Sequence, residues 1–195
     1  MMLILKISQL ARVKRCSYKD KAYSCIAKFK LVLVVVKVIE IYDSRSGFTE
    51  LMAKTVFEGV KSVAGAEAEM LRVGTPWSIS KLNEVDAIII GSPTIYGSAT
   101  SEIRELLEII EDLDECGKLK LSGKIGGVFG SYGWDGGWVV EKLSSDLENL
   151  GIKIVSPTVS LYHEKYLKVS LDEQSAKKCR ELGKTVVEKA ATKTK

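Results

Sequence analysis

The sequence holds few of the side chains that bind metal ions. It has one histidine, His163, and four cysteines that form no C-x-x-C pair and match no zinc or iron–sulfur spacing. A diiron site needs several histidine and carboxylate ligands, so a single histidine excludes it. We interpret His163 as a surface histidine, and we expect the cysteines to be reduced thiols, which are typical of a cytoplasmic protein.

A long hydrophobic run is also missing. The longest apolar stretch, Leu31 to Tyr42, is interrupted by Lys37 and Glu40, and it is shorter than the roughly 18 residues that span a membrane. The apolar start, Met1 to Leu5, precedes the positive charges and is too short for a secretory signal. We therefore expect a cytoplasmic protein with no membrane partner.

Basic residues are scarce outside the N-terminus. Residues 1–30 hold eight lysines and arginines against one aspartate, which leaves 21 basic and 24 acidic side chains in the other 165 residues. The net charge of +4 therefore belongs to the N-terminal segment, and the remainder carries −3. Because a nucleic-acid interface needs clustered lysine and arginine on the folded domain, we expect no nucleic-acid partner.

The length of 195 residues and the apolar content of 46% suit one domain, which we place at residues 35–195. Residues 1–34 are a basic N-terminal extension with no sustained hydrophobic period. Three interpretations of this segment are open: a disordered arm, an extra edge element, or an artefact of an upstream translation start. The last is favoured, because every chemically informative segment begins at or after Val38.

From Val38 onward, β-type runs alternate with amphipathic helical patterns. The pattern predicts five strands, at Val38–Tyr42, Ala66–Arg72, Ala87–Gly91, Ile125–Phe129 and Ile152–Ser160. It predicts four helices, at about Glu50–Val63, Ser101–Asp112, Trp138–Asn149 and Asp172–Ala191. Such alternation is typical of a parallel sheet covered on both faces. We therefore predict a doubly wound α/β fold with a five-stranded parallel sheet of order 2-1-3-4-5.

Two helices carry further signals, and one strand carries an exception. In the helix from Ser101, apolar side chains at steps of three and four predict a stripe facing the core, made of Ile103, Leu106, Leu107, Ile110 and Leu113. Ser170 and Glu173 are predicted to form a capping box that starts the last helix. Glu40 lies mid-strand where both faces should be apolar, so either its face is less buried than expected or its carboxyl group has a partner.

A short hydroxyl-rich loop follows the first predicted strand. It consists of Ser44, Arg45, Ser46, Gly47, Phe48 and Thr49, and it leads into a helical pattern. Such a loop directs backbone N–H groups, hydroxyls and the positive end of the helix dipole at one point, which favours a phosphate ligand bound mainly by neutral donors. The alternative is an ordinary strand-to-helix turn with Thr49 as its N-cap.

The loops after the third and fourth predicted strands have unusual compositions. The first reads Gly91-Ser92-Pro93-Thr94-Ile95-Tyr96-Gly97-Ser98 and predicts a rigid bend that presents backbone groups and one aromatic ring. The second reads Gly130-Ser131-Tyr132-Gly133-Trp134-Asp135-Gly136-Gly137, in which glycines allow close backbone approach and rings offer stacking faces. Because the carboxyl ends of the strands should share one edge, the three loops predict a site for a phosphate and a planar heterocycle. Flavin mononucleotide (FMN) has this shape.

From about Val38 to Ala191, the sequence resembles the flavodoxin superfamily. The segment Ser44 to Thr49 resembles its phosphate loop, Thr/Ser-x-Thr/Ser-Gly-x-Thr, and Gly91-Ser92-Pro93-Thr94 resembles the start of its first isoalloxazine loop. Phe129 to Gly136 is most similar to the flavodoxin module of A-type flavoproteins, the flavodiiron proteins, without their diiron domain. The resemblance implies a short-chain flavodoxin-like fold with FMN as its cofactor.

The resemblance also implies a cofactor site in three parts. Ser44, Arg45, Ser46, Gly47, Phe48 and Thr49 would bind the FMN phosphate. One side of the isoalloxazine would be lined by Pro93, Thr94, Ile95, Tyr96 and Gly97, and the other by Ser131, Tyr132, Gly133, Trp134, Asp135 and Gly136. Trp134 or Tyr96 would stack on the ring. No catalytic side chain and no metal ligand is implied, because the ring supplies the chemistry.

Three functions fit these features. The first is an electron carrier whose redox partners would be a reductase, a ferredoxin-like or rubredoxin-like protein, or a separate diiron protein. The alternative is an NAD(P)H-dependent quinone oxidoreductase of the same superfamily, but its loop usually has an arginine where this chain has Ile95. The third is an interaction domain without flavin. The sequence leaves the oligomeric state open, a homodimer included.

Overall fold

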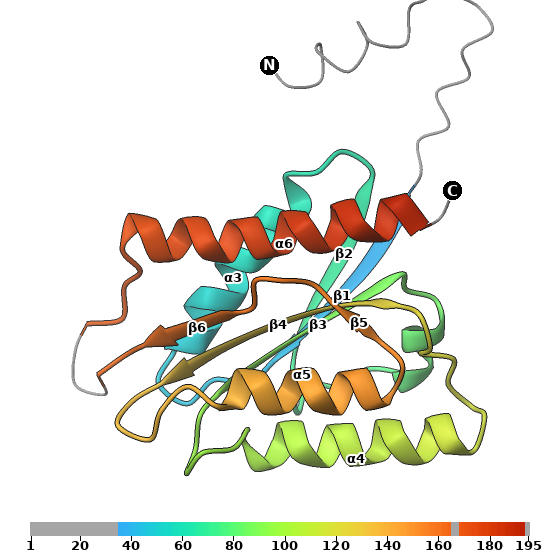
Figure 1. Ribbon diagram of the computed structural model, residues 1–195, viewed down its shortest axis with the longest axis horizontal. Coiled ribbons are helices and arrows are strands. Elements are labelled where there is room, and N and C mark those ends of the chain that lie inside the picture. The colour runs from blue at the N-terminus through green and yellow to red at the C-terminus, as the bar shows by residue number, and fades with distance from the viewer. Residues whose placement is uncertain (1–34, 165–167, 194–195) are drawn as a thin grey trace, which may run out of the picture. The chain divides into compact units, whose positions relative to one another are not determined.

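The centre of the fold consists of three strands with nearly continuous apolar sequences. β1 (Val36–Tyr42), β3 (Ala87–Pro93) and β4 (Ile125–Tyr132) are buried along almost their whole length, as expected for the middle of a parallel sheet. The computed structural model describes residues 35–164 and 168–193 (Figure 1). The three interpretations of residues 1–34 lie outside the described residues.

The strand order confirms the predicted doubly wound α/β fold. β2 (Ala66–Arg72), β1, β3, β4 and β5 (Lys153–Ile154) lie in the order 2-1-3-4-5, and each neighbouring pair is parallel. β2 is the edge strand, and its exposed residues alternate with partly buried ones, a pattern typical of a strand with one solvated face.

The fifth position of the sheet differs from the prediction. The sequence pattern predicts one strand, Ile152–Ser160, whereas the structure has two short strands, β5 and β6 (Val159–Tyr162), which both pair in parallel with β4. Pro157 lies between them and has no N–H group to donate to a strand ladder. β6 continues two residues past the predicted end, so its carboxyl end lies beside Tyr132 at the end of β4.

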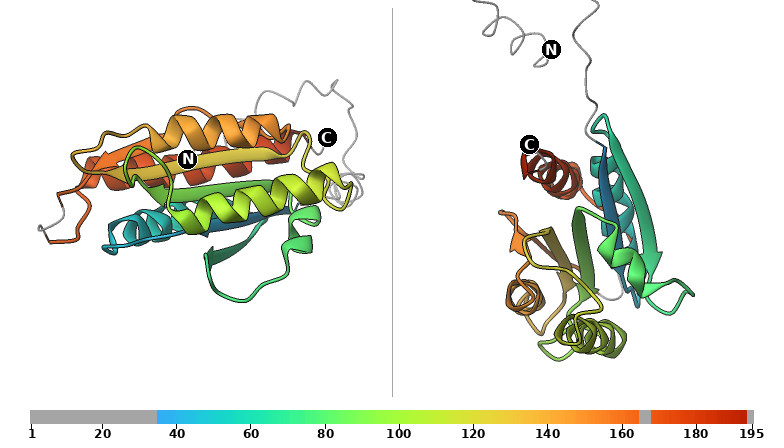
Figure 2. Two further views of the ribbon diagram at one scale, coloured as in Figure 1. Left: turned by 90° about the horizontal axis from the view of Figure 1, so that it is seen from below. Right: turned by 90° about the vertical axis from the view of Figure 1, so that its right-hand side faces the viewer.

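Helices cover both faces of the sheet (Figure 2). On one face, α3 (Phe48–Lys61) and α6 (Glu173–Lys193) share an apolar core with β1 and β4. On the other, α4 (Ser101–Glu115) and α5 (Val139–Asn149) pack over β3 and β4. None of the described helices is both long and apolar enough to cross a membrane.

The predicted apolar stripe on α4 is confirmed. Ile103, Leu107 and Ile110 are buried, and Leu106 and Leu113 are partly buried against the same core. A short 3₁₀ helix, η1 (Ile79–Asn83), lies between β2 and β3 and was not predicted from the sequence. Its Leu82 is fully buried.

Two predicted helix starts are wrong in detail. α3 begins at Phe48 with Gly47 as its N-cap, so Thr49 lies inside the first turn. α6 is capped by Asp172, whose carboxylate accepts hydrogen bonds from the N–H and the hydroxyl of Ser175 at 2.9 and 2.7 Å. Asp172 directly precedes the helix and reaches its third N–H, whereas Ser170 lies too far upstream. These hydrogen bonds lower the pKa of Asp172.

Glu40 is the polar exception in the core. Its side chain is fully buried, and neither carboxyl oxygen has a hydrogen-bond partner among the described residues. Both explanations offered by the sequence are therefore wrong, since the face is not exposed and no residue of the described part of the chain is a partner of the carboxyl group. Burial raises the pKa of Glu40 well above its ordinary value, because the charged form loses its solvation. Burial, with Glu40 adding to it, also raises the pKa of Cys179 to about 12.

α3 and α6 touch each other through two glycines. A Cβ atom added to Gly59 would overlap the carbonyl oxygen of Arg180, and one added to Gly183 would overlap that of Val56. Only residues without a side chain allow the two backbones to approach this closely. α6 therefore lies directly on α3, the helix that follows the hydroxyl-rich loop.

Candidate cofactor site

The loops after β1, β3 and β4 meet at one edge of the sheet. The hydroxyl oxygens of Thr49 and Ser131 lie 2.8 Å apart, and the N–H of Thr94 donates to the carbonyl of Ser131 at 2.7 Å. The N–H of Asp43 donates to the carbonyl of Gly91 at 3.1 Å. The segments that begin at Ser44, Pro93 and Ser131 in the sequence are therefore parts of one site.

The first loop forms a cradle of neutral donors. Gly47 has a φ of 89°, in the left-handed region that favours glycine, and its N–H donates to Ser44 Oγ at 3.1 Å. α3 starts at the next residue, so the N–H groups of its first turn have no acceptor within the helix. The positive end of the helix dipole lies at the same place. This arrangement suits an anion such as a phosphate.

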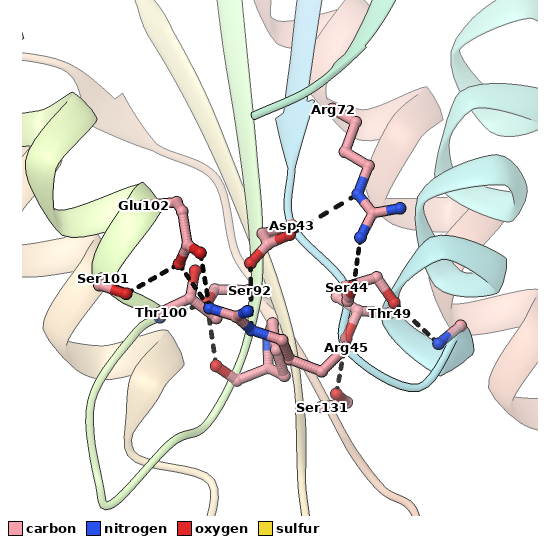
Figure 3. Close-up of polar contacts among 12 residues, drawn as sticks. Asp43, Ser44, Arg45, Thr49, Arg72, Ser92, Thr100, Ser101, Glu102 and Ser131 are labelled. Carbon is pink, nitrogen blue, oxygen red and sulfur yellow. Dashed lines mark hydrogen bonds and ion pairs between the residues drawn. The ribbon is translucent and has the colours of Figure 1, made fainter. Parts of the chain in front are cut away.

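Two guanidinium groups and one buried carboxylate lie beside the cradle (Figure 3). Asp43, whose side chain is 8% exposed, lies 3.7 Å from Arg45 Nε and 3.7 Å from Arg72 Nε. Arg72 also donates to the carbonyl of Ser44 at 2.7 Å, which ties the loop to the end of β2. Both cations therefore already have protein acceptors, which leaves the neutral N–H and hydroxyl groups for a phosphate.

Arg45 links this loop to the start of α4. Its Nη2 atom donates to both carboxylate oxygens of Glu102, at 2.8 and 2.6 Å. Hydrogen bonds from the backbone of Glu102 and from Ser101, with a smaller contribution from Arg45, hold the pKa of Glu102 below its usual value. The ion pair joins the first predicted loop to the helix that follows the second (Figure 3).

The loops surround a cavity of about 710 Å³, a volume within the range of roughly 300–1,000 Å³ for small-molecule sites. Eleven predicted site residues line it: Arg45, Ser46, Pro93, Thr94, Ile95, Tyr96, Ser131, Tyr132, Gly133, Trp134 and Asp135. Six others do not: Ser44, Gly47, Phe48, Thr49, Gly97 and Gly136. In the cavity wall, Thr94 Oγ1 is buried and has no hydrogen-bond partner among the described residues. It can therefore form a hydrogen bond with a ligand.

The two later loops begin further along the chain than predicted. Pro93 is the last residue of β3, and it pairs with Ser131 in the ladder between β3 and β4. Tyr132 is the last residue of β4. The predicted rigid bend is therefore shorter and starts at Thr94, because pairing with the neighbouring strand keeps the preceding residues extended.

Aromatic side chains form the rim of the cavity. Tyr96 and Trp134 are each 86% exposed, and their rings meet edge to face at a centroid distance of 6.4 Å. Tyr96 (φ 50°) and Gly97 (φ 77°) occupy the centre of a tight turn closed by hydrogen bonds between Ile95 and Ser98, as in a type I′ turn. The turn holds Tyr96 outward, where its face is accessible to a planar ligand.

A fourth segment lines the cavity and was missed by the sequence analysis. It consists of Tyr162, the last residue of β6, and of His163 and Glu164, which follow it. The sequence analysis interpreted His163 as a surface histidine; the residue is half-buried, and its ring stacks on Phe48 at a centroid distance of 4.1 Å and an interplanar angle of 4°. The signal was present in the topology: a fifth parallel strand must end at the same edge as β1, β3 and β4. Placing its end at Ser160 hid these residues.

Together these features fit a ligand with a phosphate at one end and a flat ring at the other. The cradle before α3 supplies neutral donors for the phosphate, and Tyr96, Trp134 and Tyr132 supply flat apolar faces. The part of the chain that the structure describes contains no cluster of three or more histidine, cysteine, aspartate or glutamate side chains suited to a metal ion.

A family model described as Flavodoxin matches residues 41–186. Putative diflavin flavoprotein A 5 of Nostoc sp. is 29% identical over 150 residues, which are 76% of this chain and 24% of that protein. An NAD(P)H dehydrogenase (quinone) of Chromohalobacter salexigens is 34% identical over 115 residues, which are 49% of this chain and 56% of that protein. The chain thus spans about a quarter and about half of these relatives.

A solved structure of a flavodoxin from the domain Archaea has the same architecture. It superposes with a TM-score of 0.65 and is 26% identical, and the match covers 80% of this chain and 99% of that chain.

Proposed function

This chain belongs to the flavodoxin family, whose cofactor is FMN, and we propose that it carries electrons between redox partner proteins. The observation that carries the proposal is the cavity of about 710 Å³ that the loops after β1, β3 and β4 line together. Its walls combine Ser46 of the hydroxyl-rich loop with exposed aromatic faces, and the neutral N–H groups of the first turn of α3 lie in the same loop connection.

We assign the binding of the cofactor to the three loops. The N–H groups at the start of α3 and the hydroxyls of Ser46 and Thr49 would bind the phosphate, with Gly47 giving the loop its left-handed turn. Tyr96 and Trp134 would lie against the ring from opposite loops. When bound, the isoalloxazine supplies one-electron and two-electron transfer, and the protein sets its potential through stacking, hydrogen bonds and charge.

The surface beside the cavity supports a docking role. α4 starts next to the cavity at Ser101 and carries seven acidic residues against one arginine along its length. Most of these carboxylates are exposed, so the helix presents a strip of negative charge. Such a strip steers partners with basic surfaces toward the cavity mouth. We therefore propose a reductase, a ferredoxin-like or rubredoxin-like protein, or a separate diiron protein as partner, each docking through a basic surface.

We propose that this electron transfer takes place in the cytoplasm. Cys116 and Cys179 are free thiols, which suits a reducing compartment.

One comparison supports a second candidate function. The NAD(P)H dehydrogenase (quinone) of Chromohalobacter salexigens is similar over about half of this chain, so an NAD(P)H-dependent quinone oxidoreductase is the alternative. Against it stands Ile95, at the position where the resemblance leads us to expect an arginine.

Absorption spectra and two reduction experiments test the proposal. The purified full chain should show flavin absorption, and addition of NADH or NADPH alone should leave the colour unchanged. After reduction by dithionite and removal of the excess, the protein should reduce cytochrome c, a basic one-electron acceptor, with a rate that falls as salt is added. Rapid bleaching by NADPH followed by reoxidation with a quinone would instead support the oxidoreductase. A colourless protein that takes up no FMN would rule out both.

A pair of variants tests the docking surface. Glu108→Lys and Glu111→Lys on α4 should slow the reduction of cytochrome c at low salt. Glu188→Lys on α6, which is also exposed, is the matched control and should have a much smaller effect. Equal effects at both places would mean that only the overall charge matters and that α4 is not the docking strip.

A further inference from the structure

The single histidine of the chain lies in the wall of the cofactor cavity. The ring of His163 is parallel to that of Phe48, the first residue of α3, at a centroid distance of 4.1 Å. Its backbone N–H donates to the carbonyl of Tyr132 at 2.8 Å. The imidazole is therefore held in place by the segment that would bind the phosphate and by the strand that leads to the ring-binding loop.

The imidazole of His163 has no hydrogen-bond partner among the residues that the structure describes. Neither ring nitrogen of His163 makes a hydrogen bond within residues 35–164 and 168–193, and Nε2 is shut off from solvent. Nδ1 is not shut off in this way, so it is the nitrogen that water or a ligand can reach. Because a buried polar atom normally finds a hydrogen-bond partner, the position of this half-buried ring in a cavity wall suggests that the partner comes with the ligand.

Charged and titratable groups reach the same cavity from every segment that borders it. Arg45 comes from the first loop, Tyr96 from the second, Asp135 and Tyr132 from the third, and Tyr162 and Glu164 from the chain on either side of His163. Arg45 is paired with Glu102, and tyrosines do not ionise near neutral pH. Histidine is the side-chain type that ordinarily changes its charge between pH 5 and 8, and His163 is the one histidine in this wall.

We propose that His163 is a redox-linked proton acceptor: it takes up one proton when one electron is delivered to the cofactor. This inference rests on the proposed function, since it requires bound FMN. The donor protein is oxidised by one electron, the cofactor is reduced by one electron, and one proton moves from water to Nδ1 of His163. The positive imidazolium then offsets the negative charge that has entered the cavity.

Thermodynamic linkage means that the coupling between reduction and protonation can be measured either on the histidine or on the flavin. If reduction of the cofactor favours the protonated imidazole, then protonation of the imidazole must favour reduction by the same free energy. The pH at which His163 is half protonated should therefore rise on reduction. The midpoint potential of the bound flavin should depend more steeply on pH with the histidine than without it.

The first test follows the imidazole directly. Because the chain has one histidine, the imidazole Cε1–H resonance belongs to His163 without further assignment. NMR titrations from pH 5 to 9 would be recorded on the FMN-loaded protein before and after full reduction by dithionite. We expect the titration midpoint to move to higher pH on reduction. An unchanged midpoint would overturn the inference.

The second test follows the flavin. His163→Phe keeps a flat ring against Phe48 but cannot bind a proton, and His163→Gln keeps a polar group without a charge change. We expect the midpoint potential of both variants to fall below that of the wild type at pH 5.5 and to approach it as the pH is raised. Glu188→Gln on α6, which is exposed and does not line the cavity, is the control and should retain the pH-dependent difference from the histidine variants.

The two proposals fail in different ways. A wild-type protein that binds no FMN would overturn the proposed function and this inference with it. A wild-type protein that binds FMN but keeps the same pH dependence of its potential in His163→Phe and His163→Gln would overturn only the role of the histidine. If a variant does not fold, the NMR titration of the wild type still decides.

Discussion

The hydroxyl oxygens of Thr49 and Ser131 lie 2.8 Å apart, although 82 residues separate them in the chain. Thr49 belongs to the first turn of α3, and Ser131 lies near the end of β4. Their contact joins the half of the site that suits a phosphate to the half that suits a flat ring. Removal of either hydroxyl should therefore affect the binding of both the phosphate and the ring of the cofactor.

Replacement of Thr49 by valine should weaken FMN binding. Valine keeps the shape of the side chain and removes its hydroxyl, and the loss of one such hydrogen bond costs about 0.5–1.5 kcal/mol, a change in affinity of roughly two- to tenfold. Titration of the apoprotein with FMN, followed by flavin fluorescence, measures this. Thr55→Val on the same helix is the matched control, because the hydroxyl of Thr55 donates to the carbonyl of Leu51 outside the cavity lining. Similar losses in both variants would mean that α3 was merely destabilised.

Gly47→Asp should abolish FMN binding. The new carboxylate would stand where we place the phosphate, and the left-handed backbone at this position disfavours any side chain. Gly117→Asp controls for the second effect, since Gly117 also has a positive φ and open space around it but follows α4 away from the cavity. Equilibrium dialysis with FMN should give no binding for the first variant and normal binding for the second. Unchanged flavin content in Gly47→Asp would refute the placement of the phosphate.

Trp134→Ala should weaken FMN binding by about 1 kcal/mol or more through lost stacking and burial, which is roughly a fivefold loss of affinity. Trp138→Ala is the comparison, because Trp138 comes from the same connection and is also exposed but does not line the cavity. A fluorescence titration that shows no change for Trp134→Ala would exclude it as a stacking residue and leave Tyr96 in that role.

Glu40→Gln should make the protein more stable at neutral pH. The folded-state pKa of Glu40 lies above its unfolded value, so the folded protein keeps a proton that the unfolded chain releases above about pH 4.3. The free energy of unfolding of the wild type therefore falls as pH rises from there towards the folded pKa. In Glu40→Gln this decline should be absent.

Urea unfolding between pH 4 and 8 compares the two proteins. The curves should lie close together at pH 4 and separate as the pH rises, with the variant the more stable. Glu67→Gln on the neighbouring strand is the control, since Glu67 is exposed. Parallel curves for Glu40→Gln and the wild type would show that Glu40 ionises in the folded protein without cost.

The parts of the fold that depend on hydrophobic pattern were predictable. β2 has the predicted bounds, Ala66–Arg72, because its alternation and its flanking turns are local signals. The hydroxyl-rich and glycine-rich loops were recognisable for the same reason, since their unusual composition is continuous in the sequence. The strand order then placed them at a common edge.

The parts that depend on long-range packing were not predictable. The stack of His163 on Phe48 joins residues at opposite ends of the domain, and no local pattern marks it. The fifth strand is divided at Pro157, which cannot donate to the strand ladder. The apolar residues on both sides of Pro157 led to the prediction of one continuous strand. The complete burial of Glu40 depends on how tightly α3 and α6 cover β1, which a single sequence does not reveal.

α3 contacts α6 through Gly59 and Gly183. Cofactor binding should therefore depend on the C-terminal helix as well as on the loops. No residue of α6 borders the cavity, yet this helix supports the one whose first turn would hold the phosphate. A chain truncated before Glu173 would retain all the loops but would lack the helix that supports α3. We therefore expect the truncated protein to be purified without bound flavin.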